Sequence, residues 1–158
     1  MNPSVDDRLA SIVRALADIV LTALPDDAGL AKEQTQLAIG HLQILRAQLD
    51  AAPAFEAEEL SDARALGAAL LADGRGGSGT VEAMSALHAT LDQPVGAEHP
   101  RQSRLRITKA IDNLLRQMAI DGDQGYRAKA ADVLIRMQTE RSKKDRKWFS
   151  LMGFDSDI

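Results

Sequence analysis

Residues 4–27 read SVDDRLASIVRALADIVLTALPDD, a pattern typical of one amphipathic helix. Ser4 is suited to cap a helix amino terminus, and two aspartates follow where the helix dipole is positive. Apolar residues then recur at steps of three and four, which places them on one stripe of the helix. The stripe comprises Val5, Leu9, Ile12, Leu16, Ile19, Val20 and Ala23. Pro25 ends the pattern because proline cannot continue a helix.

The same spacing continues through most of the chain, with few β-branched runs. Further helices are expected over about residues 27–51, 56–72, 80–91 and 101–120 and from about residue 123 onward. Short connections between such helices favour antiparallel neighbours. The sequence therefore predicts an all-α fold, a compact and mostly up-and-down bundle of about six helices. We expect one bundle domain over residues 1–140, with residues 141–158 as a basic and aromatic C-terminal extension of the last helix.

Composition sets limits on the kind of protein. A chain of 158 residues can bury a hydrophobic core without help from metals or disulfides. It contains no cysteine, which excludes disulfides, thiolate metal sites and thiol nucleophiles. The amino terminus lacks the basic start of a signal peptide, and the longest uncharged run, 12 residues, is short for a membrane span. We expect a soluble, cytoplasmic protein.

Charge is unevenly distributed along the chain. Residues 1–100 hold 6 basic and 15 acidic residues, whereas residues 101–158 hold 13 basic and 8 acidic residues. Within one domain, this asymmetry is most simply explained by acidic helices that pack beside basic ones. Because the net charge is −4 and no aromatic residues alternate with the basic ones, we do not expect a nucleic-acid partner.

Two glycine-containing segments resemble ligand-binding loops, and both resemblances fail in detail. GRGGSGT, residues 74–80, lacks the lysine of a phosphate-binding loop, so we expect a flexible linker with Thr80 capping the next helix. DGDQG, residues 121–125, lacks side-chain oxygens at later positions of a calcium loop, so we expect a turn and an N-cap at Asp123.

No set of residues indicates catalysis, and no histidine pair has metal-ligand spacing. We expect no metal, no cofactor and no enzymatic activity.

The segment QTQLAIGHLQILRAQL, residues 34–49, carries polar side chains within an apolar helix face. Gln34, His41 and Gln48 stand seven residues apart and therefore form one line, which we call the polar lane. If buried, each side chain needs a hydrogen-bond partner. Three explanations remain open: pairing with neighbouring helices or water, a heptad position that sets the register of an oligomer, and the polar end of a ligand cavity.

The C-terminal segment RSKKDRKWFSLMGFDSDI holds three of the five aromatic residues. Trp148, Phe149 and Met152 are candidate anchors for a protein partner. The simpler alternative is that this segment covers one end of the bundle or of a second subunit, and membrane contact is less expected still.

Taken together, these patterns favour a non-catalytic accessory or protein-interaction protein, expected as a homodimer and able to contact a partner through the C-terminal segment. The alternative is a carrier or sensor of a small, largely apolar ligand bound between helices near the polar lane. An enclosed cavity beside Gln34, His41 and Gln48 would distinguish the two hypotheses.

Overall fold

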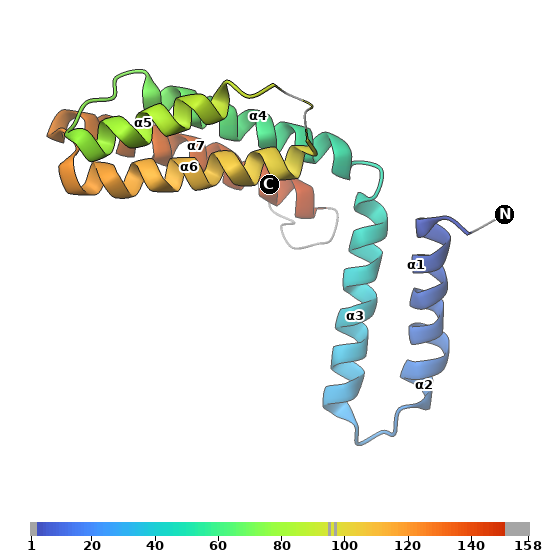
Figure 1. Cartoon of the computed structure of the whole chain (residues 1–158). Helices are drawn as coiled ribbons and strands as arrows, with labels where there is room; N and C mark the ends of the chain where they lie inside the picture. The colour runs from blue at the N-terminus through green and yellow to red at the C-terminus, as the bar shows by residue number, and fades with distance from the viewer. Residues whose placement is uncertain (1–2, 95, 97, 151–158) are drawn as a thin grey trace. The chain divides into compact units, whose positions relative to one another are not determined.

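The computed structural model describes residues 3–94, 96 and 98–150, with side chains up to residue 146. This part of the chain is all-α and forms six helical segments, which confirms the predicted helical bundle (Figure 1). In the described residues the β-type pairing is limited to an isolated antiparallel bridge between Gly76 and Gly122.

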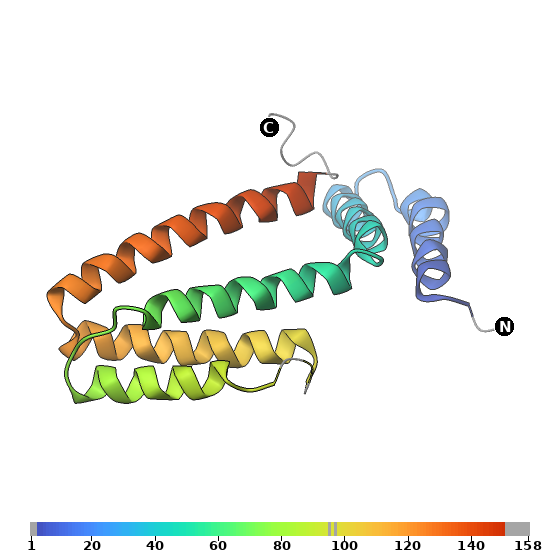
Figure 2. The ribbon, with the colours of Figure 1, turned by 90° about the horizontal axis from the view of Figure 1, so that it is seen from above.

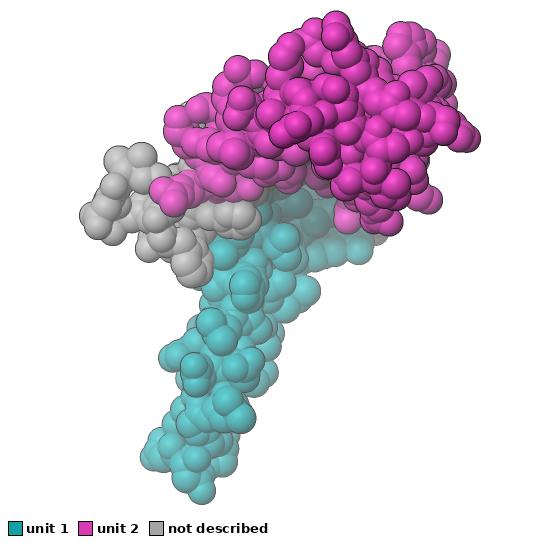
Figure 3. Space-filling view, turned by 90° about the vertical axis from the view of Figure 1, so that its left-hand side faces the viewer, with its two compact units in different colours: residues 1–53 teal, residues 54–158 magenta. Residues whose placement is uncertain are grey.

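The chain divides into two compact units, residues 1–53 and residues 54–158, which are described separately below (Figure 3). This division differs from the expected domain over residues 1–140 with an extension over residues 141–158. Helix α7 (Gln124–Ser150) passes residue 140 without a break. Nothing in the described residues tests the expected boundary at residue 140, which stays a prediction.

Unit 1 is an antiparallel helical hairpin. Its first segment consists of α1 (Val5–Arg14), the π-helix η1 (Ala15–Val20) and α2 (Leu21–Ala23), and its second is α3 (Gly29–Gln48). Ser4 caps α1 as predicted: its Oγ accepts from Asp7 N–H at 3.1 Å, and the Asp7 carboxylate accepts from Ser4 N–H at 3.0 Å. Arg46, near the end of α3, binds the Asp6 carboxylate through Nε at 2.8 Å and Nη2 at 3.1 Å. This pair joins the first turn of α1 to the last turn of α3.

The π-helix η1 was not predicted. A π-helical turn contains more residues than an α-helical one, so it rotates the side chains that follow it. Ile19, which was expected on the inner stripe, is 66% exposed. Among the described residues of unit 1, Val13 is the one buried apolar side chain, and it is 9% exposed.

Unit 2 contains α4 (Ala52–Leu71), α5 (Ser78–Leu91), α6 (Pro100–Asp121) and α7. Helices α5 and α6 pack directly against each other, and Figure 2 shows α4 beyond them and α7 on the far side of α4. The core is aliphatic except for one tyrosine. Its buried residues are Leu60, Leu70, Ala83, Leu87, Ile107, Ile111, Leu114, Met118, Tyr126 and Ala130.

The two glycine-containing segments of unit 2 bind each other. Gly77 N–H donates to the Asp121 carbonyl at 2.8 Å, and Asp123 N–H donates to the Arg75 carbonyl at 3.0 Å. A Cβ atom on Gly77 would lie 2.5 Å from Oδ2 of Asp121, so the close approach requires glycine. The expectation of a flexible linker is therefore wrong: residues 74–80 are hydrogen-bonded to the turn between α6 and α7.

Acidic and basic residues pair across unit 2, as their uneven distribution along the sequence suggested. Each pair joins an acidic residue before position 100 to a basic residue after it. The pairs are Glu59 with Arg104 and Arg141, Asp62 with Lys144, Asp73 with Lys129, and Glu98 with Arg106. Most of these groups are partly exposed, so they orient the helices more than they stabilise them.

Candidate functional site

The polar lane lies on an exposed face of α3. Gln34 and His41 are exposed, and Gln48 is partly buried. The same face holds Leu30, Leu37 and Leu45, which are 72%, 50% and 53% exposed. We call these six residues the α3 outer face: Leu30, Gln34, Leu37, His41, Leu45 and Gln48. The charged residues of α3, which are Lys32, Glu33 and Arg46, fall outside it at about 100° per residue.

The side of α3 that packs against the first helical segment is a different one. Its partly buried residues recur at steps of three and four: Thr35, Ile39, Leu42, Arg46 and Leu49. No residue of α3 is fully buried. The sequence placed the polar lane within one apolar face of this helix and left open whether that face is internal, at a contact between subunits or in a pocket. A two-helix hairpin gives each helix only one neighbour, which leaves the outer face of α3 uncovered within this unit.

Gln48 differs from the other two lane residues. Its Nε2 is buried and has no hydrogen-bond partner among the described residues. A buried amide without a partner lowers the free energy of unfolding by about 1–3 kcal/mol relative to a paired one. For the first explanation of the lane, pairing with neighbouring helices or water, this atom has no protein partner among the described residues.

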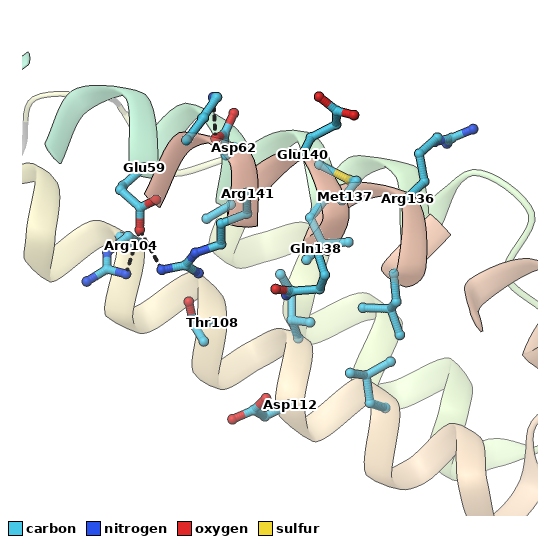
Figure 4. Close-up of a pocket in the computed structure, with 16 residues that line it drawn as sticks. Glu59, Asp62, Arg104, Thr108, Asp112, Arg136, Met137, Gln138, Glu140 and Arg141 are labelled. Atoms are coloured by element: carbon cyan, nitrogen blue, oxygen red, sulfur yellow. Dashed lines mark hydrogen bonds and ion pairs between the residues drawn. The ribbon is translucent and has the colours of Figure 1, made fainter. Parts of the chain in front are cut away.

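A groove of about 350 Å³ lies in unit 2 between α4, α6 and α7 (Figure 4). Its apolar part is formed by Ala63, Leu66, Ile111, Leu115, Leu134 and Met137. Charged side chains stand at its rim, and Figure 4 shows Arg136 and Glu140 directed away from the groove. The volume and the mixture of apolar and polar lining are within the range of small-molecule sites.

Glu59 organises one end of this groove. It is 7% exposed, and its Oε2 accepts from Arg104 Nη1 at 3.0 Å and from Arg141 Nη2 at 2.8 Å (Figure 4). Nearby, Lys144 Nζ donates to Asp62 Oδ2 at 2.6 Å, and this bond raises the pKa of Lys144. Both sets of bonds connect α7 to α4 across the opening.

These groove residues were not identified from the sequence. Acidic residues near the start of a helix, as in α4, are expected from the helix dipole alone and so do not by themselves indicate a site. Their partners lie 45 and 82 positions away, so only the tertiary fold brings them together. The opposite charges of the two parts of the chain were the one available signal.

The predicted lane residues and the groove are separate. None of Gln34, His41 and Gln48 lines the groove. Trp148 and Phe149 belong to the helical backbone of α7, but their side chains lie outside the described residues, and so does all of Met152. The predicted role of these three residues stays a prediction.

The described residues contain neither a metal-binding cluster nor a membrane-spanning helix. No group of three or more His, Asp or Glu side chains there is placed to hold a metal ion. No described helix is both long and apolar enough to cross a membrane.

Comparison with known proteins adds no relative. No protein-family model, no curated protein and no solved structure matches the chain. The proposals that follow therefore depend on the geometry of this molecule alone.

Proposed function

We propose that the chain is a non-catalytic interaction protein that assembles through the α3 outer face. The observation that carries the proposal is the exposure of Leu30, Leu37 and Leu45, each by half or more, on a face without charge. Burying the exposed part of each leucine would contribute about 1–2 kcal/mol. An uncharged apolar helix face of this kind is suited to pack against another helix.

The rest of unit 1 supports assembly. A hairpin of two helices with one buried apolar side chain among its described residues has a small core. Such small units commonly depend on association for stability. Val5, Ile12 and Val20 of the first segment are also exposed, by 62%, 47% and 40%. A contact between two chains that also included these residues would bury more apolar surface than a contact made by α3 alone.

The experiment is a mass measurement of the untagged protein in solution by light scattering and native mass spectrometry. We expect twice the 17.0 kDa mass of the chain. A Leu37→Glu/Leu45→Glu variant should be monomeric, with its helix content unchanged by circular dichroism. Each glutamate would otherwise be buried without a partner.

The matched control adds the same two charges elsewhere on the same helix. Gln36 and Gln43 are exposed and lie on the opposite side of α3 from the lane. A Gln36→Glu/Gln43→Glu variant should keep the mass of the unmodified protein. If the leucine variant and this control assemble alike, the proposal is wrong.

The C-terminal residues Trp148 and Phe149 remain candidate anchors for a partner. In a Trp148→Ala/Phe149→Ala variant, we expect assembly or partner capture to weaken. If neither changes, these residues have no part in the function.

A second candidate function is the binding of a small, largely apolar ligand, and the groove between α4, α6 and α7 is the observation that favours it. A ligand in that groove would appear in native mass spectra as an added mass that a Leu115→Trp variant loses, because the indole would fill the space. Leu105 is on the same helix, 54% exposed and outside the groove, so Leu105→Trp is the control. An added mass that survives Leu115→Trp would exclude the groove.

A further inference from the structure

Five of the six residues of the α3 outer face follow an order that is symmetric about His41, whereas Leu30 has no counterpart within α3. Gln34 and Gln48 each stand seven positions from His41, and Leu37 and Leu45 each stand four positions from it. Reversing the direction of the helix therefore places a glutamine on a glutamine and a leucine on a leucine. This is the property that a self-complementary contact between two copies requires.

We propose that α3 pairs with α3 of a second copy in antiparallel orientation, with the two-fold axis at His41. The inference rests on the proposed function, and it adds the partner and the register. In this pairing His41 faces His41 of the second copy, Leu37 faces its Leu45, and Gln34 faces its Gln48. Antiparallel helices also place opposite ends of their dipoles side by side.

The charge pattern of the face fits a second copy. The charged residues of α3 lie on its other sides, so two outer faces meet without like-charge contacts and without burying a charge. The apolar contacts come from leucines that are exposed in the single chain. The same face would offer little to a strongly charged partner.

Gln34 and Gln48 would determine the register in which the two α3 helices align. An amide has both a donor and an acceptor, so Gln34 of one copy and Gln48 of the other can each donate and accept. Turning the Gln48 side chain outward to this contact would also pair the Nε2 that is now buried without a partner. A shift of the helices by three positions would place one of the glutamines, Gln34 or Gln48, against a leucine of the other copy. A polar residue at a heptad position disfavours such a shifted register.

Single cysteines test this geometry directly, because the chain has none of its own. The variants are His41→Cys, Gln34→Cys and Gln48→Cys in the full-length protein, with Gln43→Cys on the opposite side of α3 as the control. Each is treated with a short bismaleimide and analysed on a denaturing gel. A cross-linker suits the spacing of packed helix axes, about 8–10 Å, better than a disulfide does.

We expect His41→Cys to cross-link to itself about tenfold more than Gln43→Cys, since only position 41 meets its own copy. Gln34→Cys and Gln48→Cys should not cross-link alone but should do so when the two variants are unfolded, mixed and refolded together. Circular dichroism of each variant checks that its helix content is intact.

Three other results would overturn the inference. Self-cross-linking of all three lane variants would indicate parallel pairing. A dimer that requires Leu37 and Leu45 but does not cross-link in the His41→Cys variant would reject the two-fold axis at His41 and leave the proposed function standing. A monomer at every concentration tested would reject both this pairing and the proposed assembly.

Discussion

Asp121, the last residue of α6, caps the amino terminus of α5 through Thr80. Its Oδ1 accepts from the Thr80 hydroxyl at 2.5 Å and from Thr80 N–H at 3.0 Å, and its Oδ2 accepts from Gly79 N–H at 2.8 Å. A residue 41 positions away thus satisfies backbone donors that a local N-cap usually satisfies. The two segments that resembled a phosphate loop and a calcium loop therefore hydrogen-bond to each other and connect the start of α5 to the end of α6.

Removing this cap should destabilise unit 2. Asp121→Ala leaves three donors of the first turn of α5 without their carboxylate, and the loss of a cap is one of the established causes of destabilisation. We expect a lower melting temperature and a lower urea midpoint than for the unmodified protein. Asp132→Ala, at an exposed position of α7, is the control and should have little effect. Equal melting temperatures for the two variants would contradict the capping role.

The same carboxylate predicts a loss of stability in acid. The hydrogen bond from the Thr80 hydroxyl, with those from the Gly79 and Thr80 N–H groups, holds the pKa of Asp121 below its usual 3.8. The folded state therefore binds this proton less readily than the unfolded state, and stability falls as the pH falls from about 4 through the folded-state pKa. Urea unfolding between pH 6 and pH 3, about the range of carboxyl titration, measures this. The fall should be smaller in Asp121→Asn, and an identical fall would contradict the prediction.

Tyr126 fixes the start of α7 to the end of α4. The tyrosine is 4% exposed, and its hydroxyl donates to the Leu70 carbonyl at 2.7 Å. Tyr126→Phe should lower the free energy of unfolding by about 1 kcal/mol, because the buried carbonyl loses its partner while the ring still packs. Chemical denaturation measures this change, and an unchanged midpoint would show that the bond contributes nothing net.

Burial also raises the pKa of Tyr126 above 10.0. Since the neutral phenol is favoured in the folded state, its contribution to stability is present below pH 10 and is lost as the pH rises through the folded-state pKa. It is the single tyrosine of the chain, so absorbance titration of the native protein reports on it alone. A titration that matches that of the unfolded chain would contradict the buried position.

Glu59 should be more important than the neighbouring carboxylates of α4. It is buried and shared by Arg104 and Arg141, so Glu59→Gln removes the charge that both guanidinium groups face. We expect a loss of about 1–3 kcal/mol, which is moderate because both arginines are partly exposed. Glu58→Gln, at the exposed neighbouring position, should be nearly neutral. If the two variants unfold at the same urea concentration, the pairing has no net stabilising effect.

The helices and several of their ends were predictable, because local signals determine them. Ser4 at the start of α1 and Asp123 before α7 both act as the N-caps that their positions suggested. Thr80 was wrongly expected to cap the next helix. It lies inside α5 and receives the Asp121 carboxylate instead, which depends on a contact distant in sequence that no local pattern reports.

The candidate site was predicted only in part. The seven-residue spacing of Gln34, His41 and Gln48 correctly placed them in one line, because that depends only on helix geometry. Whether the polar lane is covered depends on how many helices pack around α3. The sequence did not predict that α3 belongs to a two-helix unit. The groove around Glu59 needs three helices from distant parts of the chain, so the sequence did not reveal it.

The π-helix of the first segment has a consequence for insertions and deletions. A π-helical turn holds about one residue more than an α-helical turn, so η1 contains a residue that a continuous α-helix would not. Deleting one residue between Ala15 and Val20 should therefore convert this turn to α-helix and leave Leu21 and Leu24 facing as they do now. The wider turn is thus a place where the first segment can lose a residue without rotating the part of the helix that follows.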